Sequence, residues 1–216
     1  MKKLGLAALC LFAAVDTTRA ASIVSGSVLF DSAPAGIFGG WTINFSSTDP
    51  AYKLNSVVIS LGGANLFLDT QLPAPGATLW QDFNITGGGA PTGFTSISPG
   101  TTAARDGATS YTLNFSNFTS GKTFSYQLDV DNCNDLLSLS CSIVNGSEFA
   151  GATATFNFGG PDAGSFSRTA AFAAVPGGTD FDAQASFRAE VPEPTTWTLI
   201  GSALAGIGLI RRKRQA

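Results

Sequence analysis

Histidine is absent from the 216 residues. This absence excludes Ser-His-Asp and Cys-His catalysis, imidazole ligation of zinc and general-base catalysis by histidine. Charged residues are also few, at 12% of the chain. Seven of the 12 Lys and Arg residues lie in the terminal segments, so residues 21–190 carry five cations, 13 acids and a net charge of about −8. Phosphate binding needs clustered cations, so this composition argues against a nucleic-acid partner.

Long apolar runs are missing from the middle of the chain and occur only at its two ends. At the N-terminus, two lysines are followed by an apolar run over residues 4–15 and then by small residues. This pattern predicts a secretory signal peptide over residues 1–20, which signal peptidase cleaves between Ala20 and Ala21. The run of 12 residues is too short to cross about 30 Å of hydrocarbon at 1.5 Å per residue.

The C-terminal apolar run is flanked on both sides. The triplet Pro192, Glu193 and Pro194 precedes an almost uncharged stretch at residues 195–210, and the basic cluster Arg211, Arg212, Lys213 and Arg214 follows it. As a helix this stretch is about 24 Å long, shorter than a hydrocarbon core of roughly 30 Å, so it predicts a marginal transmembrane helix. The positive-inside bias keeps the basic cluster in the cytoplasm and places residues 21–194 outside.

The order of these three parts closely resembles the PEP-CTERM sorting signal of Gram-negative bacteria. The resemblance covers about residues 191–214 and implies recognition by exosortase, an integral-membrane enzyme that resembles cysteine transpeptidases. It further implies removal of the tail and delivery to the cell surface or the extracellular polysaccharide matrix. Pro192, Glu193 and Pro194 would be the recognition residues.

A physical reason for the triplet stands beside the resemblance. Each proline fixes its φ angle and lacks a backbone donor, so the chain is extended there and cannot continue the helix. A protease-like site can grip an extended peptide of this kind. The alternative is that the triplet is only a stiff linker ahead of a permanent single-pass anchor.

Residues 21–190 form the predicted extracellular domain, with the sorting signal at 191–216. Apolar residues alternate with polar ones in several segments; for example, Trp41, Ile43 and Phe45 are separated by single polar residues. Clusters rich in Gly, Pro, Asp and Ser separate these segments, and no window has convincing helical spacing. Roughly nine to eleven short strands are therefore expected, in an all-β, antiparallel two-sheet sandwich of jelly-roll or immunoglobulin-like kind.

Cys133 and Cys141 are the only cysteines that remain after removal of the signal peptide. In an oxidising compartment the simplest expectation is a disulfide that closes a small loop, with a free or metal-binding pair as the alternative. Two thiolates without histidine make a poor zinc site.

An acidic segment directly precedes the first of these cysteines. Asp129, Asp131 and Asp135 place carboxylates at intervals that suit Ca²⁺, which prefers oxygen ligands. The glycine and the distal glutamate of an EF-hand loop are missing, so calcium binding is the secondary interpretation. The preferred one is a strand that ends in a turn rich in Asx residues. No other cofactor is expected.

Three functions remain open at this stage. The first is a non-enzymatic surface or matrix protein, exported, sorted by exosortase and associated with exopolysaccharide or biofilm. The second is a carbohydrate-binding module, with or without calcium, for which Trp80 is the candidate exposed platform while Trp41 is expected in the core. The third is a glycoside hydrolase with two carboxylates, because that chemistry needs no histidine. No spacing selects such a pair, so a non-enzymatic protein is the prediction.

Overall fold

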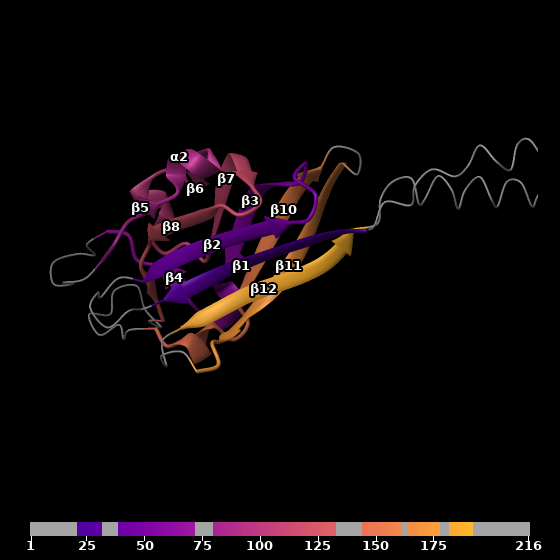
Figure 1. Cartoon of the computed structure of the whole chain (residues 1–216). Helices are drawn as coiled ribbons and strands as arrows, with labels where there is room; N and C mark the ends of the chain where they lie inside the picture. Colours follow the sequence, from indigo (N-terminus) through magenta and orange to yellow (C-terminus); the bar gives the residue numbers. More distant parts are fainter. Residues whose placement is uncertain are drawn as a thin grey trace, which may run out of the picture. The chain divides into compact units, whose positions relative to one another are not determined.

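The computed structural model describes residues 21–31, 39–71, 80–132, 144–160, 164–177 and 182–191. Residues Ile23–Ala189 form one compact unit. Most of the regular secondary structure in the described part of the chain is β-strand, with two short α-helices and two 3-10 turns (Figure 1). In chain order the elements are β1 (Ser22–Asp31), β2 (Gly40–Ser47), β3 (Lys53–Ser60), η1 (Gly62–Ala64), β4 (Phe67–Leu68), β5 (Asn84–Gly87), α2 (Gly89–Thr92), β6 (Phe94–Ser98), α3 (Thr102–Arg105), β7 (Ser110–Thr119), β8 (Thr123–Gln127), β9 (Val130–Asp131), η2 (Gly146–Phe149), β10 (Thr153–Gly160), β11 (Gly164–Ala174) and β12 (Ala183–Val191).

Ten of these strands form one antiparallel sheet in the order β5-β8-β2-β1-β12-β11-β10-β3-β7-β6. The remaining two, β4 and β9, pair with each other in a small second sheet. Buried and half-exposed or exposed residues alternate along the long strands, as in β1 and β10. This alternation arises because successive side chains of a strand point to opposite faces of the sheet. The prediction of an all-β, antiparallel fold is confirmed.

The large sheet folds over on itself at β11. Residues 164–171 of β11 pair with β10, whereas Phe172, Ala173 and Ala174 pair with β12. The sequence predicted two sheets, but this one long strand belongs to both halves and joins them into a single sheet. Aromatic side chains then meet between the halves, where Trp41 of β2 contacts Tyr111 of β7 and Phe45 of β2 contacts Phe158 of β10.

The core contains Trp41, which is 1% exposed. Its ring stacks on Tyr126 of the neighbouring strand β8 at a centroid distance of 5.9 Å, and its Nε1 donates a hydrogen bond to the Leu128 carbonyl at 2.9 Å. A buried indole N–H usually needs such a partner. The expectation that Trp41 lies in the core is confirmed.

The two edges of the folded sheet are consecutive in the chain. β5 leads through Gly88 into α2, and α2 leads through Gly93 into β6. Gly88 has φ 73°, and a Cβ there would lie 1.9 Å from the Thr123 carbonyl oxygen of β8, so this close approach requires glycine. Helix α2 packs against β6, β7 and β8 and so covers the seam between the edges.

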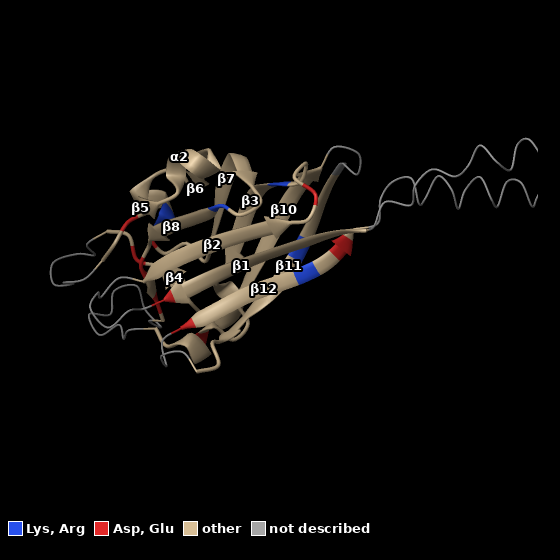
Figure 2. Ribbon diagram, viewed as in Figure 1, with Lys and Arg blue, Asp and Glu red and all other residues tan. Residues whose placement is uncertain are grey.

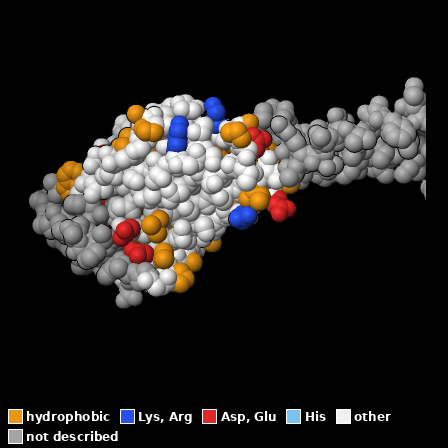
Figure 3. All heavy atoms as spheres, viewed as in Figure 1, with side chains coloured by type: hydrophobic (Ala, Val, Ile, Leu, Met, Phe, Trp, Pro, Cys, Tyr) orange, Lys and Arg blue, Asp and Glu red, His pale blue; other side chains and the backbone are white. Residues whose placement is uncertain are grey.

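The outward side chains of the sheet are mostly short and uncharged, and Figure 3 shows a surface with few charged or apolar groups. They bond across strands, as in the Thr155–Thr169 hydroxyl pair at 2.8 Å and the bond from Asn157 to Ser56 at 3.0 Å. Opposed hydroxyl and amide groups stabilise neighbouring strands without needing charge. This pattern explains how the domain accommodates so few charged residues.

Several predictions fall on segments outside the described residues. These are the signal peptide up to Ala20, the triplet Pro192, Glu193 and Pro194, the apolar stretch with its basic cluster, and the cysteines Cys133 and Cys141. Among the residues that the structure does describe, no helix has the length and apolar character needed to cross a bilayer. Ala21 is described and exposed, and β1 begins at the next residue.

Candidate functional site

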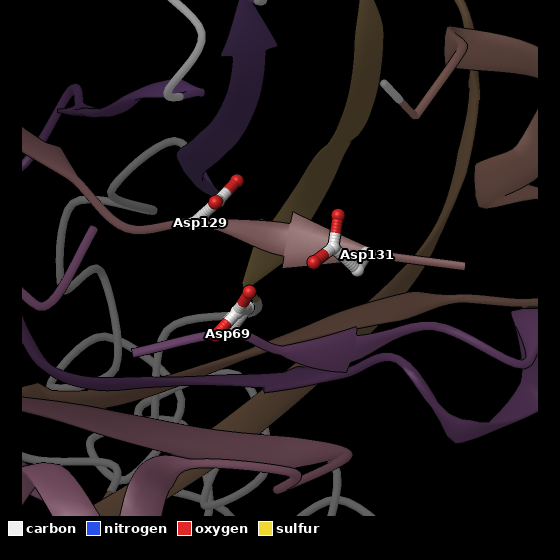
Figure 4. A group of neighbouring side chains, drawn as sticks. All are labelled: Asp69, Asp129 and Asp131. Atoms are coloured by element: carbon white, nitrogen blue, oxygen red, sulfur yellow. The ribbon is translucent and has the colours of Figure 1, made fainter. Parts of the chain in front are cut away.

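Three carboxylates meet at the small second sheet. Strand β4 pairs with β9, with Leu68 opposite Val130, so the segment after β4 runs beside the acidic segment around β9. The backbone N–H of Asp69 donates to the Asp129 carbonyl at 3.2 Å. Figure 4 shows Asp129 just before β9 and Asp131 at the end of β9, with Asp69 on the adjacent segment. Ligand atoms of all three carboxylates lie within 4.8 Å of one another.

We call Asp69, Asp129 and Asp131 the acidic cluster. Burial and mutual repulsion raise the pKa values of its three carboxyl groups. Asp129 is only 7% exposed, and burial together with the charges of Asp131 and Asp69 raises its pKa to about 8. Burial and the charge of Asp69 raise the pKa of Asp131 to about 7. Burial also raises the pKa of Asp69, although a hydrogen bond with Asp131 opposes that change. Removing a carboxylate from water disfavours its ionised form, and neighbouring carboxylates add to that cost.

The chemistry of the acidic cluster follows from these shifts. Three close carboxylates cannot all ionise at neutral pH unless a cation compensates them, so the cluster either retains protons or holds a positive ion. Carboxylate oxygens are ligands that Ca²⁺ accepts, and Ca²⁺ takes six to eight oxygens, of which backbone carbonyls and water can supply the rest. Among the described residues this is the one group of acids with metal-binding proximity.

The sequence predicted only part of this arrangement. It selected Asp129 and Asp131, which the structure does bring together, while Asp135 lies outside the described residues. It missed Asp69, which is 60 residues before Asp129. No local spacing connects these two residues, because their proximity depends on the long-range pairing of two-residue strands. Whether calcium occupies the acidic cluster stays a prediction.

A second polar arrangement lies in the segment before β5. Arg105, in α3, is 6% exposed, and its Nε and one terminal nitrogen donate to the two oxygens of Asp82 at 2.9 and 2.8 Å. Thr102 Oγ1 donates to Asp82 as well, at 2.5 Å. Burial raises the pKa of Asp82. The hydrogen bonds that Arg105, Thr102 and the Phe83 N–H donate to it lower the pKa by a larger amount, so the net shift is downward. This bidentate ion pair holds α3 against the segment that contains Asp82, two residues after Trp80.

Two large apolar side chains are exposed among the described residues, Trp80 at 37% and Ile85 at 41%. Ile85 also lines an open groove of about 500 Å³, whose other lining residues include Phe94 and the glycines between β5 and β6. The groove has no charged side chain in its lining. Such a surface offers backbone hydrogen bonds and apolar contact, and no acid or base for catalysis.

The C-terminal residues carry the one match with known proteins. The family model described as the PEP-CTERM protein-sorting motif matches residues 190–214. The chain carries a PEP-CTERM sorting motif. No curated protein and no solved structure matches the chain. The PEP-CTERM motif implies an exported protein, a membrane-anchored precursor and exosortase as the processing partner, which confirms the resemblance drawn from the triplet, the apolar stretch and the basic cluster.

Proposed function

We propose that the protein is a non-enzymatic surface or extracellular-matrix protein that exosortase trims at the C-terminus and that associates with exopolysaccharide or biofilm. The PEP-CTERM motif at residues 190–214 is the observation that carries this proposal. Two features of the domain support it. The surface is dominated by short uncharged side chains (Figure 3), and the groove beside β5 lacks charged groups. Neutral hydroxyl and amide groups suit a hydrated polysaccharide environment better than an ionic partner.

Intact-mass measurement of the released protein tests the processing. The expected mass lacks the C-terminal segment that begins near Thr195, whereas a released protein that still contains residues 195–216 would contradict trimming. Replacing Pro192 and Glu193 by alanine should leave the precursor in the membrane fraction. Thr195→Ser, just outside the triplet, is the matched control and should be processed normally.

The second candidate is a carbohydrate-binding module. The exposure of Trp80 favours it, because an exposed indole can stack on a sugar ring. Affinity electrophoresis in gels that contain the producer's polysaccharide provides the measurement, with and without calcium. Trp80→Ala should lose retention while Ile85→Ala, which removes the other exposed apolar side chain, should keep it. Equal migration of the wild type with and without polysaccharide would rule out this candidate.

We also infer a sandwich of jelly-roll type. The pairs β2–β8 and β3–β7 are nested, because the chain runs out through β2 and β3 and returns through β7 and β8. Nested pairs of this kind support the jelly-roll alternative among the two that the sequence left open. An experimental structure of the exported domain would test this inference through its strand order.

A further inference from the structure

The domain contains five tripeptides of the form Asn-x-Ser/Thr, called sequons here, and the structure describes all of them. They begin at Asn44, Asn84, Asn114, Asn117 and Asn145. In exported proteins this tripeptide is the acceptor of N-linked oligosaccharides. The enzyme that transfers the oligosaccharide has to bind the tripeptide, so the exposure of each sequon in the folded domain decides which of them is available.

Three of the sequons lie in strands that have a neighbour on both sides. Asn44 is in β2, between β1 and β8, whereas Asn114 and Asn117 are in β7, between β3 and β6. The middle residue of each is a phenylalanine of the core, at most 6% exposed. An enzyme could bind these tripeptides only by separating strands and exposing the core.

The sequon at Asn145 is part of a tight turn. Asn145 is the N-cap residue of η2, and its backbone N–H donates to the Glu148 carboxylate at 2.5 Å. The next residue, Gly146, is buried, and a Cβ there would lie 2.1 Å from the Asp182 carbonyl oxygen. The backbone of this sequon therefore leaves no room for a second molecule.

The sequon at Asn84 is open along its whole length. Asn84, Ile85 and Thr86 are all exposed, Ile85 by 41%. They belong to β5, the terminal strand of the large sheet, which pairs with β8 alone among the described strands. This pairing is short, and its register shifts between Ile85 and Gly87. Few backbone hydrogen bonds therefore hold the tripeptide in the sheet.

The acceptor nitrogen of this sequon is weakly engaged. Asn84 Nδ2 lies 3.4 Å from Gln127 Oε1, beyond the usual range of about 2.7–3.2 Å for an N–H···O bond. By contrast, Asn114 Nδ2 donates to Ser96 Oγ at 3.1 Å. The Asn84 amide can thus turn toward an incoming group at little cost.

Strand β5 also lacks part of the protection that edge strands usually have. Natural proteins keep strand edges from pairing with other molecules by short length, bulges, charged side chains or proline. β5 is short and irregular in register, but it has no charged residue and no proline (Figure 2), and its Ile85 is exposed. A bulky, hydrated glycan on Asn84 would cover this edge.

We propose that Asn84 is an N-glycosylation site, modified after export, and that its oligosaccharide shields the edge at β5. The proposal needs export, which the PEP-CTERM motif implies, and it does not depend on association with exopolysaccharide. The donor is an oligosaccharide linked through pyrophosphate to a polyprenyl carrier, and a membrane oligosaccharyltransferase is the partner. Asn84 Nδ2 forms a bond to the anomeric carbon and releases one proton. The bond from that carbon to the pyrophosphate oxygen breaks, and the carrier pyrophosphate leaves with the electron pair.

Mass spectrometry of the protein purified from its producer tests the site. The intact mass of the wild type should exceed that of the polypeptide by one oligosaccharide, and peptide mapping should place the addition on Asn84. Thr86→Ala, which removes the sequon but keeps the asparagine, should lose the addition completely. Thr86→Ser keeps the hydroxyl and is the matched control, which should retain it. Thr119→Ala, which removes the sequon at Asn117, should leave the addition unchanged.

Light scattering tests the shielding of the edge. The unmodified Thr86→Ala protein should have a weight-average mass above that of the monomer at concentrations at which the glycosylated wild type is monomeric. Adding Ile85→Lys to Thr86→Ala places a charge on the unshielded edge and should restore the monomer. Circular dichroism confirms that each variant is folded.

Each outcome decides one part of the proposal. A wild type with the mass of the polypeptide alone would overturn glycosylation, as would an addition that Thr86→Ala retains. Equal occupancy of the sequons in β2 and β7 would show that exposure in the folded domain does not select the site. Equal scattering by the glycosylated wild type and Thr86→Ala would overturn the shielding. The same spectra report separately whether residues 195–216 are present, so a failure of C-terminal trimming is distinguished from a failure at Asn84.

Discussion

The hydroxyl groups of Tyr111 and Tyr126 lie 2.8 Å apart in the fully buried core between the two halves of the sheet. Burial, which disfavours the ionised form, and the neighbouring Tyr126 raise the pKa of Tyr111 well above its usual value, so the pair stays neutral and hydrogen-bonded. The bond connects β7 to β8, which belong to opposite halves of the folded sheet. It is therefore a polar contact between the two halves inside an otherwise apolar core.

Removing one partner of this pair should cost more than removing both. Tyr126→Phe leaves the Tyr111 hydroxyl buried without its partner, which costs about 1–3 kcal/mol of unfolding free energy. The double variant, with phenylalanine at both positions, should recover part of that loss because no buried hydroxyl is left. Urea unfolding of the two single variants and the double variant measures the difference. Additive losses would contradict the coupling.

The acidic cluster should make the protein less stable as the pH rises. The pKa of Asp129 is raised to about 8 and that of Asp131 to about 7, from an ordinary value of 3.8. The folded state therefore binds protons that the unfolded state releases, and this stabilisation is complete below about pH 4 and lost as the pH rises toward 8. Each such proton changes the unfolding free energy by up to about 1.4 kcal/mol per pH unit.

Asp129→Asn tests that dependence. The amide keeps the shape and can still accept from the Val130 N–H, which bonds Asp129 Oδ1 at 3.0 Å. The variant should gain melting temperature over the wild type at pH 8 and differ little at pH 5. Glu190→Gln removes an exposed carboxylate and serves as the control. A wild type whose stability is flat between pH 5 and 8 would show that the cluster does not titrate there.

Calcium should counteract the loss of stability at high pH. A ligand that binds only the folded state stabilises it by RT ln(1 + [L]/Kd) and so raises the melting temperature, and protons compete for the same carboxylates. Millimolar calcium should therefore raise the melting temperature at pH 8 more than at pH 5, and a chelator should reverse the effect. Asp69→Asn should reduce the response. No calcium response at pH 8 would leave the Asx-rich turn as the interpretation of this segment.

The pair between Arg105 and Asp82 should be the most sensitive ion pair of the described residues. Asp82→Asn leaves a 6% exposed guanidinium without its carboxylate, and breaking a buried pair in this way costs about 3–5 kcal/mol. Because the Asp82 side chain is 22% exposed, we expect the lower end of that range. Arg105→Lys should also destabilise, since an ammonium cannot bond both oxygens in the fork geometry. Arg168→Lys, on an exposed residue, is the control for thermal unfolding.

Period-two alternation predicted the strands well because it follows from which face of a strand is buried. Trp41, Ile43 and Phe45 are all buried on one face of β2, and Tyr111, Leu113 and Phe115 are buried on β7. The continuity of the large sheet could not be predicted in this way. It depends on β11 changing partner from β10 to β12, and alternation within a strand contains no information about its neighbours.

The candidate sites show the same limit. Asp129 and Asp131 were recognisable because their spacing is local, whereas Asp69 and Arg105 depend on contacts between distant segments. The sorting motif was the most predictable feature. Its function depends on an extended peptide and an apolar stretch that are continuous in the chain, so no tertiary contact is needed to recognise it.

The connection between the edge strands β5 and β6 has a consequence for association between copies of the protein. Unpaired strand edges invite association with strands of other molecules. Because both edges of this sheet are consecutive in the chain, a single four-residue helix, α2, connects them and packs against β6, β7 and β8. Insertions between β5 and β6 would thus be expected to promote self-assembly into fibres, whereas insertions in the turn between β7 and β8 would not.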